Sequence, residues 1–329
     1  MKTQNKTMTA KQFIDALTQG EIVPNGTEVI APKGAVVDYK DRLAVLRVPH
    51  LKHFPGVKVI GDLFIIDCPN LETIDPELTV TGEFQVNSCP NLTNIHNPQC
   101  SEFVIWICPN IVELPELSHE GLLEVRVAGI GCTKVSKITA VNEIRFHQCK
   151  NLVEVSDFHS AIVAFTESPE LQIVNNITCT KELQFNGSPK IVDLPDIGDG
   201  NHLQCMMLAD TGVQVIPNTY FDTGADKPMH EHSQVLFINN PALHAIPAIV
   251  VEELDIFNCP GVNSIPSGTR VNLLELSSWT VTCEPGVIIN DKLRIKDGSV
   301  DIEDFLNNRV VKPETSSSES DEEYDILGP

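Results

Sequence analysis

LFIIDCPNLETI (residues 63–74), FQVNSCPNLTNI (84–95) and FVIWICPNIVEL (103–114) are three copies of one pattern. The pattern reads apolar-x-apolar-x-x-Cys-Pro-x-apolar-x-x-apolar. Alternating apolar residues predict a short strand with one buried side, and the Cys-Pro pair predicts a bend where that strand ends. A repeat of this kind decides the fold, because each copy is one structural unit.

The pattern continues along most of the chain in diverged form. IRFHQCKNLVEV from Ile144 and LDIFNCPGVNSI from Leu254 keep its apolar spacing. The first apolar residues of the units stand at positions 43, 63, 84, 103, 125, 144, 163, 183, 206, 235, 254 and 274. Successive starts lie 19 to 23 residues apart, except for one interval of 29. This near-constant spacing predicts an array of about twelve units.

The length of a unit limits its shape. After each short strand, roughly 12 residues return the chain to the next strand, which is too few for a helix with its caps. We therefore expect extended, polyproline or 3₁₀ returns, with the strands as parallel neighbours in one sheet. A single unit cannot bury its apolar side, and stacking the units creates a continuous core. The predicted fold is a β-rich solenoid.

The bend residue, sixth in each unit, is small and polar or a thiol. It is Cys68, Cys89, Cys108, Cys149 and Cys259, or elsewhere Ser168, Ser188, Thr211 and Asn240. Backbone carbonyls lose their ladder partners where a strand ends, so this column should donate hydrogen bonds to them. Stacked cysteines point the same way, which keeps their Cβ atoms too far apart for disulfides, and no Cys-x-x-Cys pair suggests zinc.

The units resemble the leucine-rich repeat superfamily. The LxLxxCPxLxxI form is similar to its cysteine-containing consensus, and LADTGVQVIP from Leu208 resembles a shorter asparagine-type unit. The segments around Gly61 and Gly82 also resemble receptor L domains. The resemblance covers about residues 43–285 and implies a right-handed coil. It implies an architecture and leaves the partner open.

Four segments follow from the repeat boundaries. Residues 1–42 form an N-terminal cap with a short amphipathic helix near residues 9–17, and residues 43–285 form the solenoid. Residues 286–312 form a C-terminal cap, with a last strand and a short helix near 301–308. Residues 313–329 (PETSSSESDEEYDILGP) hold six acids and no base, which predicts a disordered acidic tail. The tail is solubilising or a second binding element.

The composition restricts the partners. With 45 acidic and 23 basic residues, the formal net charge is −22, which disfavours nucleic acid and anionic membranes. We find no apolar segment typical of a signal peptide and none long enough to span a membrane. We expect a soluble, cytoplasmic protein with reduced cysteines and without a cofactor.

Motifs for chemistry are weak. Asp-Thr-Gly occurs at Asp210 and Asp222, but two aspartic-protease carboxylates this close in one chain cannot occupy symmetric lobes. The long unit that starts at residue 206 carries a loop whose His230 and His232 could bind metal with a nearby aspartate. A loop of this type is more often only solvated. We expect no metal site and no enzyme.

The sheet face is the expected contact surface. The second and fourth residues of each strand should point outwards. Apolar residues gather near the N-terminal units and again near the C-terminal units, with a basic spot between them. The candidate partner-binding residues are Leu46, Phe64, Ile66, Val104 and Trp106; Arg126, Arg145 and His147; and Met207, Leu236, Ile238 and Phe257. Large exposed apolar patches usually mark interaction sites.

Three functions follow in order of preference. The first is a non-enzymatic scaffold that binds a protein partner, of unknown identity, on the sheet face. The second is a structural component, of a virion or another assembly, that self-associates through the same face. The third is a carbohydrate-active enzyme using Asp255 and Glu275, although no third acid accompanies them.

Overall fold

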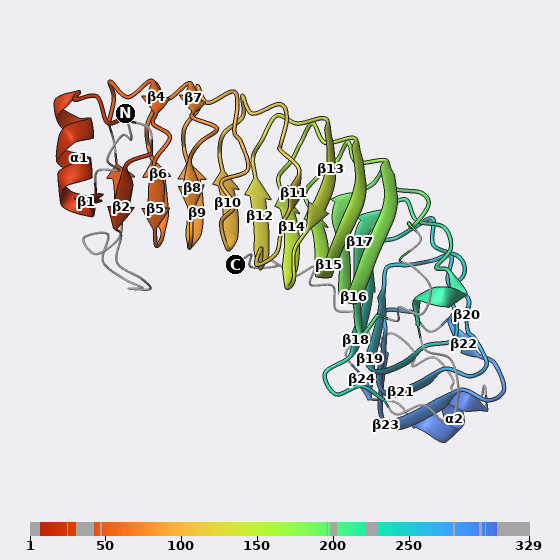
Figure 1. The fold of residues 1–329 in the computed structure, drawn as a ribbon. Helices are drawn as coiled ribbons and strands as arrows, with labels where there is room; N and C mark the ends of the chain where they lie inside the picture. The colour runs from red at the N-terminus through yellow and green to blue at the C-terminus, as the bar shows by residue number, and fades with distance from the viewer. Residues whose placement is uncertain are drawn as a thin grey trace.

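The computed structural model is a curved stack of short parallel strands, a β-solenoid of about 13 turns (Figure 1). The structure describes residues 7–24, 26–30, 43–46, 48–195, 197, 203–221, 229–278, 280–295, 298–299 and 301–307. For strand residues 43–46 and 298–299 it describes the backbone. The predicted acidic tail, 313–329, lies outside these residues.

The main sheet follows the repeat. Its strands, in spatial order, are β3 (Leu43–Leu46), β6 (Leu63–Ile66), β9 (Glu83–Asn87), β10 (Glu102–Trp106), β12 (Glu124–Ala128), β14 (Glu143–His147), β15 (Glu154–Thr166), β16 (Ile173–Ser188), β17 (Cys205–Thr211), β18 (Gln234–Ile238), β19 (Val250–Phe257), β21 (Arg270–Leu276), β23 (Ile288–Ile295) and β24 (Gly298–Ser299). All neighbours pair in parallel except β23 and β24.

The predicted register is confirmed. Every predicted unit start is the Cα partner of the next, from Leu43 with Leu63 through to Leu254 with Leu274. Leu293 on β23 continues this column by one more turn. From β6 onwards, the first and third residues of these units are at most 2% exposed. Equal offsets therefore do stack in columns.

The return segments also pair with one another, which the repeat did not predict. They form a four-stranded sheet of β1 (Thr7–Thr9), β2 (Glu28–Ile30), β5 (Lys58–Ile60) and β8 (Thr79–Val80), and the pairs β4 (His53–Phe54) with β7 (Thr73–Ile74) and β20 (Ser264–Ile265) with β22 (Thr282–Cys283). β11 (Leu117–Ser118) and β13 (Lys134–Thr139) join β15. One return contains a 3₁₀ helix, η1 (Asn218–Tyr220). Equal spacing brings extended returns into register too.

Thiols of the bend column donate hydrogen bonds to backbone carbonyls, as expected. These carbonyls nevertheless keep a backbone N–H partner, and the Ser188 hydroxyl has no hydrogen bond within the described residues. The Cys108 thiol lies 3.3 Å from the Trp106 carbonyl oxygen, and the Cys259 thiol lies 3.2 Å from that of Phe257. No cysteine is in a disulfide. Burial raises the pKa of the Cys132 thiol to about 12, so this thiol is neutral and a poor nucleophile or metal ligand.

A second column at the bend was not foreseen. The fifth residue of ten units has a left-handed backbone, with φ between 50° and 65°, at Asp67, Ser88, Ile107, Gly129, Gln148, Glu167, Gly187, Asp210, Asn239 and Asn258. The strand ends sharply at this residue, which turns the chain towards the return segment. The side chains at this position differ in size, charge and polarity. The repeat pattern therefore did not predict the left-handed column.

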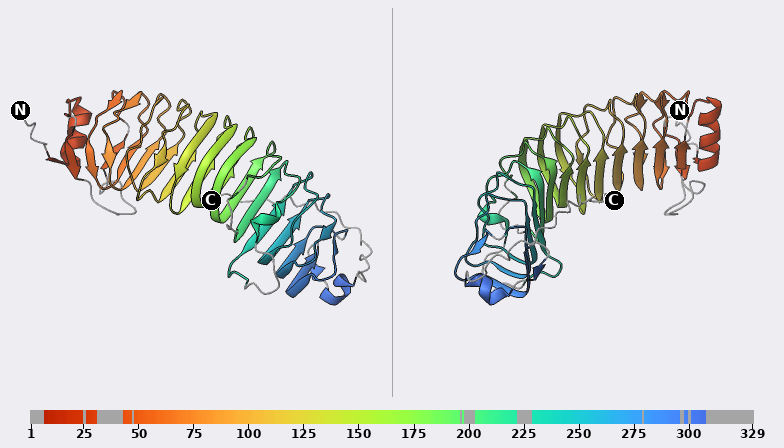
Figure 2. Two further views of the ribbon diagram at one scale, coloured as in Figure 1. Left: turned by 45° about the vertical axis from the view of Figure 1, so that its right-hand side comes forward. Right: turned by 180° about the vertical axis from the view of Figure 1, so that it is seen from behind.

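Short helices cover the two ends of the stack (Figure 2). The N-terminal helix α1 (Ala10–Gln19) begins at a capping box formed by Thr9 and Gln12, and its Phe13 packs 5.9 Å from Phe54 between ring centroids. The C-terminal helix α2 (Ile302–Leu306) buries Phe305. Both predicted helices are confirmed, and both shield core residues that the array would otherwise leave exposed.

An asparagine side chain, instead of a cysteine thiol, makes the hydrogen bonds at the bend that follows the longest unit. The buried Asn240 amide accepts from the Thr211 N–H at 3.0 Å and donates to the Leu208 carbonyl at 2.7 Å.

We expect Asn240→Ala to lower the free energy of unfolding by about 3 kcal/mol, because these buried groups lose their partners. Urea unfolding monitored by circular dichroism measures this. Asn94→Ala, at an exposed side chain, is the control; equal effects would contradict the role of Asn240.

Candidate functional site

The outward face of the main sheet holds the predicted contact residues, but their exposure differs. Trp106 is 43% exposed, whereas Phe64 and Val104 are only 4% and 2% exposed. The expectation that Phe64 and Val104 are exposed is therefore wrong. Side chains of neighbouring strands, at a spacing of about 4.8 Å, cover a residue flanked on both sides. Leu46 lies on β3, where the structure describes only the backbone.

The N-terminal patch consists of the exposed Trp106 and Ile107 with the half-buried Ile66, and we call it the Trp106 patch. Ile66 and Trp106 share the fourth-position column, with Asn87 between them. Ile107, which the sequence analysis did not select, follows Trp106 at the bend and is 61% exposed. The patch thus extends from the sheet face around the corner.

A groove runs beside Ile107 at this corner. It has a volume of about 390 Å³ and is lined by Asp67, Pro69, Ser88, Pro90, Ile107 and Pro109. The prolines are held in a row by the asparagines that follow them: Asn91 donates to the Pro69 carbonyl and Asn110 to the Pro90 carbonyl, both at 2.8 Å. The groove is therefore built on a rigid part of the chain.

Ile107 has an unusual backbone for its residue type. Its φ is 53°, and a left-handed conformation at a β-branched residue costs about 1–3 kcal/mol. The other described members of this column are Asp, Ser, Gly, Gln, Glu and Asn, without a second β-branched residue. The strained position thus carries an exposed apolar side chain, which stability alone does not favour.

The predicted basic spot is charge-balanced. Arg126 lies 2.6 Å from Glu143 and also pairs with Glu124, while Arg145 lies 2.8 Å from Glu143. Burial alone would raise the pKa of Glu143, but hydrogen bonds from Arg145 and Arg126 lower it. His147 is 2.7 Å from the Thr166 hydroxyl. These residues are not a free positive surface.

Glutamates form a column that sequence analysis missed, at the position before each unit start. Its members include Glu83, Glu102, Glu124, Glu143, Glu182 and Glu253. Burial and the neighbouring Glu124 raise the pKa of Glu102. The signal was present in the sequence at a constant offset, but only the second and fourth positions were considered to face outwards.

The C-terminal patch, Met207, Leu236, Ile238 and Phe257, is half-buried throughout. Asp255 stands within it and is only 6% exposed. Burial, followed by the charges of Glu253 and Glu275, raises the pKa of Asp255 to about 7. The carboxylate of Glu275 pairs with Arg294 on the next strand.

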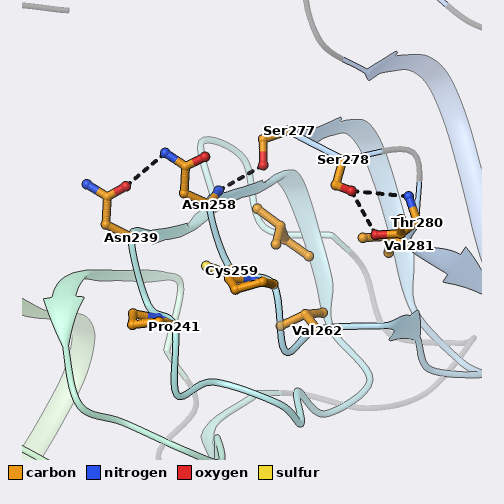
Figure 3. Close-up of a pocket in the computed structure, with 11 residues that line it drawn as sticks. Asn239, Pro241, Asn258, Cys259, Val262, Ser277, Ser278, Thr280 and Val281 are labelled. Carbon is orange, nitrogen blue, oxygen red and sulfur yellow. Dashed lines mark hydrogen bonds between the residues drawn. The ribbon is translucent and has the colours of Figure 1, made fainter.

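A larger hollow lies at the bend of the last turns (Figure 3). It has a volume of about 600 Å³, and no charged side chain lines it. Asn258 bridges its neighbours, donating from its side chain to Asn239 at 3.0 Å and from its N–H to Ser277 at 2.8 Å. The thiol of Cys259 is engaged by backbone carbonyls. These groups offer no acid, base or free nucleophile.

The long unit places its aromatic residues in the core. Tyr220 donates a hydrogen bond to the Pro195 carbonyl, and Phe221 is 2% exposed. His230 and His232 are exposed, while Asp222 lies outside the described residues. Within the residues that the structure describes, no three potential ligands are grouped for a metal, and no helix has the length and hydropathy to cross a bilayer.

We expect Asp255→Asn to stabilise the protein at pH 8 but not at pH 4. Because folding raises its pKa, the carboxyl contributes stability at low pH that is lost as pH rises from about 3.8 to about 7. The amide cannot ionise, so the variant gains on the order of 4 kcal/mol at pH 8. Urea unfolding at both pH values measures this, with the exposed Asp291→Asn as control. A pH-independent difference would contradict the shift.

Comparisons of the chain with protein-family models, curated proteins and solved structures gave no match. The likeness to leucine-rich repeats thus rests on the repeat pattern of the chain itself. Its function has to be inferred from the residues on its surface.

Proposed function

We propose that this protein is a non-enzymatic scaffold that binds a protein partner at the Trp106 patch. The observation that carries this proposal is the exposed pair Trp106 and Ile107, in which Ile107 has a left-handed backbone. Glycine, asparagine or aspartate would fit this backbone with less strain, and several other turns use them. An exposed isoleucine there is best explained by a contact that it makes with another molecule.

The shape and composition of the patch favour a protein. A tryptophan beside a proline-lined groove offers the rigid apolar surface at which protein interfaces concentrate their binding energy. The glutamate column and the net charge of −22 disfavour nucleic acid and anionic lipid. The ten cysteines form no disulfide, which supports a reducing compartment such as the cytoplasm.

Two substitutions test the patch, and they should differ in their effect on stability. Trp106→Ala should weaken binding of the captured partner at least tenfold, with stability changed by less than about 0.5 kcal/mol. Ile107→Gly should also weaken binding, yet raise the unfolding free energy by about 1 kcal/mol by relieving the backbone strain. Partners captured from lysate and identified by mass spectrometry provide the ligand, and calorimetry then measures each affinity.

Two control substitutions complete the design. Val112→Ala removes an apolar side chain that is 60% exposed elsewhere, so it should leave binding unchanged. Phe64→Ala should unfold the array more easily, because its ring is buried. Full affinity in both Trp106→Ala and Ile107→Gly would contradict the proposal. A concentration-dependent dimer in light scattering that Trp106→Ala abolishes would identify a second copy as the partner and replace the scaffold by self-association.

A further inference from the structure

Asp255 is the one charged side chain that is buried among the described residues. It does not lie in the core between the sheets. It is the second residue of its unit and lies on the outward face of β19, where the preceding turns carry Leu236 and Met207. An apolar or neutral side chain would pack here at lower cost, because burying a carboxylate without partners is unfavourable.

Further carboxylates surround Asp255 on the same face. Glu253 precedes it by two residues on β19, and Glu275 is its Cα partner on β21. Among the described residues, Glu275 is the one of these three acids with a cationic partner, Arg294 on β23. Gln234 on β18 is exposed and hydrogen-bonds the Asp255 carboxyl. These are the polar groups that face Asp255 from the strands packed around it.

One oxygen of this carboxyl has no partner. Asp255 Oδ1 is fully buried and makes no hydrogen bond, although a buried unpaired acceptor costs about 1–3 kcal/mol. The missing partner is a donor, and since Glu253 and Glu275 add negative charge, the group that fits best is a cation. The half-buried Leu236, Ile238 and Phe257 lie beside it and offer an apolar surface.

The chemistry of the cation follows from these neighbours. Three metal ligands are not grouped within the described residues, which disfavours a divalent metal. General acid catalysis with Glu275 as nucleophile is disfavoured because Arg294 occupies the Glu275 carboxylate, and neither hollow described above includes Asp255. A lysine or arginine side chain has both a charged head and an alkyl stem that packs on apolar residues.

We infer that Asp255, Glu253 and Glu275 form a binding site for a lysine or arginine side chain of a polypeptide partner. The charged head takes the place of Gln234 beside Asp255, and the stem lies against Leu236 and Phe257. The site is seven strands from the Trp106 patch along the main sheet, and its existence does not depend on that patch.

Binding at this site is linked to pH. A cation binds the ionised carboxyl in preference to the neutral one, so affinity should rise as pH increases through about 7. By reciprocity, a bound cation lowers the pKa of Asp255. Glu253, Glu275 and Arg294 are the charged groups that face the same carboxyl from β19, β21 and β23.

The test uses the full-length chain with ¹³C-labelled aspartate carboxyls and the capped peptide acetyl-Leu-Lys-Leu-amide. NMR titration from pH 5 to pH 9 gives the pKa of Asp255, with its signal assigned by its loss in Asp255→Asn. Saturating peptide should lower this pKa by about one unit, which corresponds to a tenfold preference for the ionised form. Asp255→Asn, an uncharged mimic of the protonated carboxyl, should bind the peptide at least tenfold more weakly.

A control peptide and a control variant show whether the lysine charge and the Asp255 carboxyl are responsible for binding. The same peptide with norleucine in place of lysine should leave the pKa unchanged, and Asp291→Asn, which removes an equal charge, should bind as the wild type does. An unchanged pKa at saturating lysine peptide would overturn the inference without any substitution. Equal affinity of Asp255→Asn and the wild type would also overturn it, and would show that Asp255 is a protonated structural residue. Trp106→Ala should leave this binding intact, which separates the two sites.

Discussion

The structure depends on the in-register stacking of parallel strands, and that stacking depends on what happens where each strand ends. In each unit, four or five residues pair in the main sheet before the chain turns, although some strands begin earlier in the return segment. The left-handed fifth residue produces the turn. Thiols at the sixth residue, such as Cys108 and Cys259, donate to the carbonyl of the fourth residue, which also accepts a backbone N–H from the preceding turn. Without this pair of positions, the ladder would lose its regular length and the core columns would no longer align.

Much of the stacked architecture could be predicted from the repeat alone. The register from Leu43 to Leu274, the buried columns and the donor role of the bend thiols all follow from apolar spacing, because equal offsets must stack. The left-handed column could not be predicted, since Asp67, Gln148 and Ile107 share no property except their place. The burial of Phe64 and Val104 also escaped the pattern, because it arises from neighbours on adjacent strands.

On the surface too, the sequence pattern predicted the positions of side chains but not their interactions with neighbouring strands. Arg126 and Arg145 were predicted as a basic spot because single columns were considered, whereas the structure pairs both with the adjacent glutamate column. The unusual environment of Asp255 likewise depends on Glu253 and Glu275 together. What remains on the face after this neutralisation is an exposed apolar corner at Trp106 and an uncompensated carboxyl at Asp255. Both are properties that the array does not need for its own folding.

The claim beneath all of these conclusions is that equal offsets lie in continuous columns along one curved coil. A double electron–electron resonance distance between spin labels at Asn87→Cys and Ile238→Cys, in a Cys205→Ser background, measures it directly. These positions share one column on strands seven steps apart, so the account predicts a single narrow distribution near about 34 Å. A broad distribution, or a distance that does not match seven strand spacings, would contradict the columnar stack.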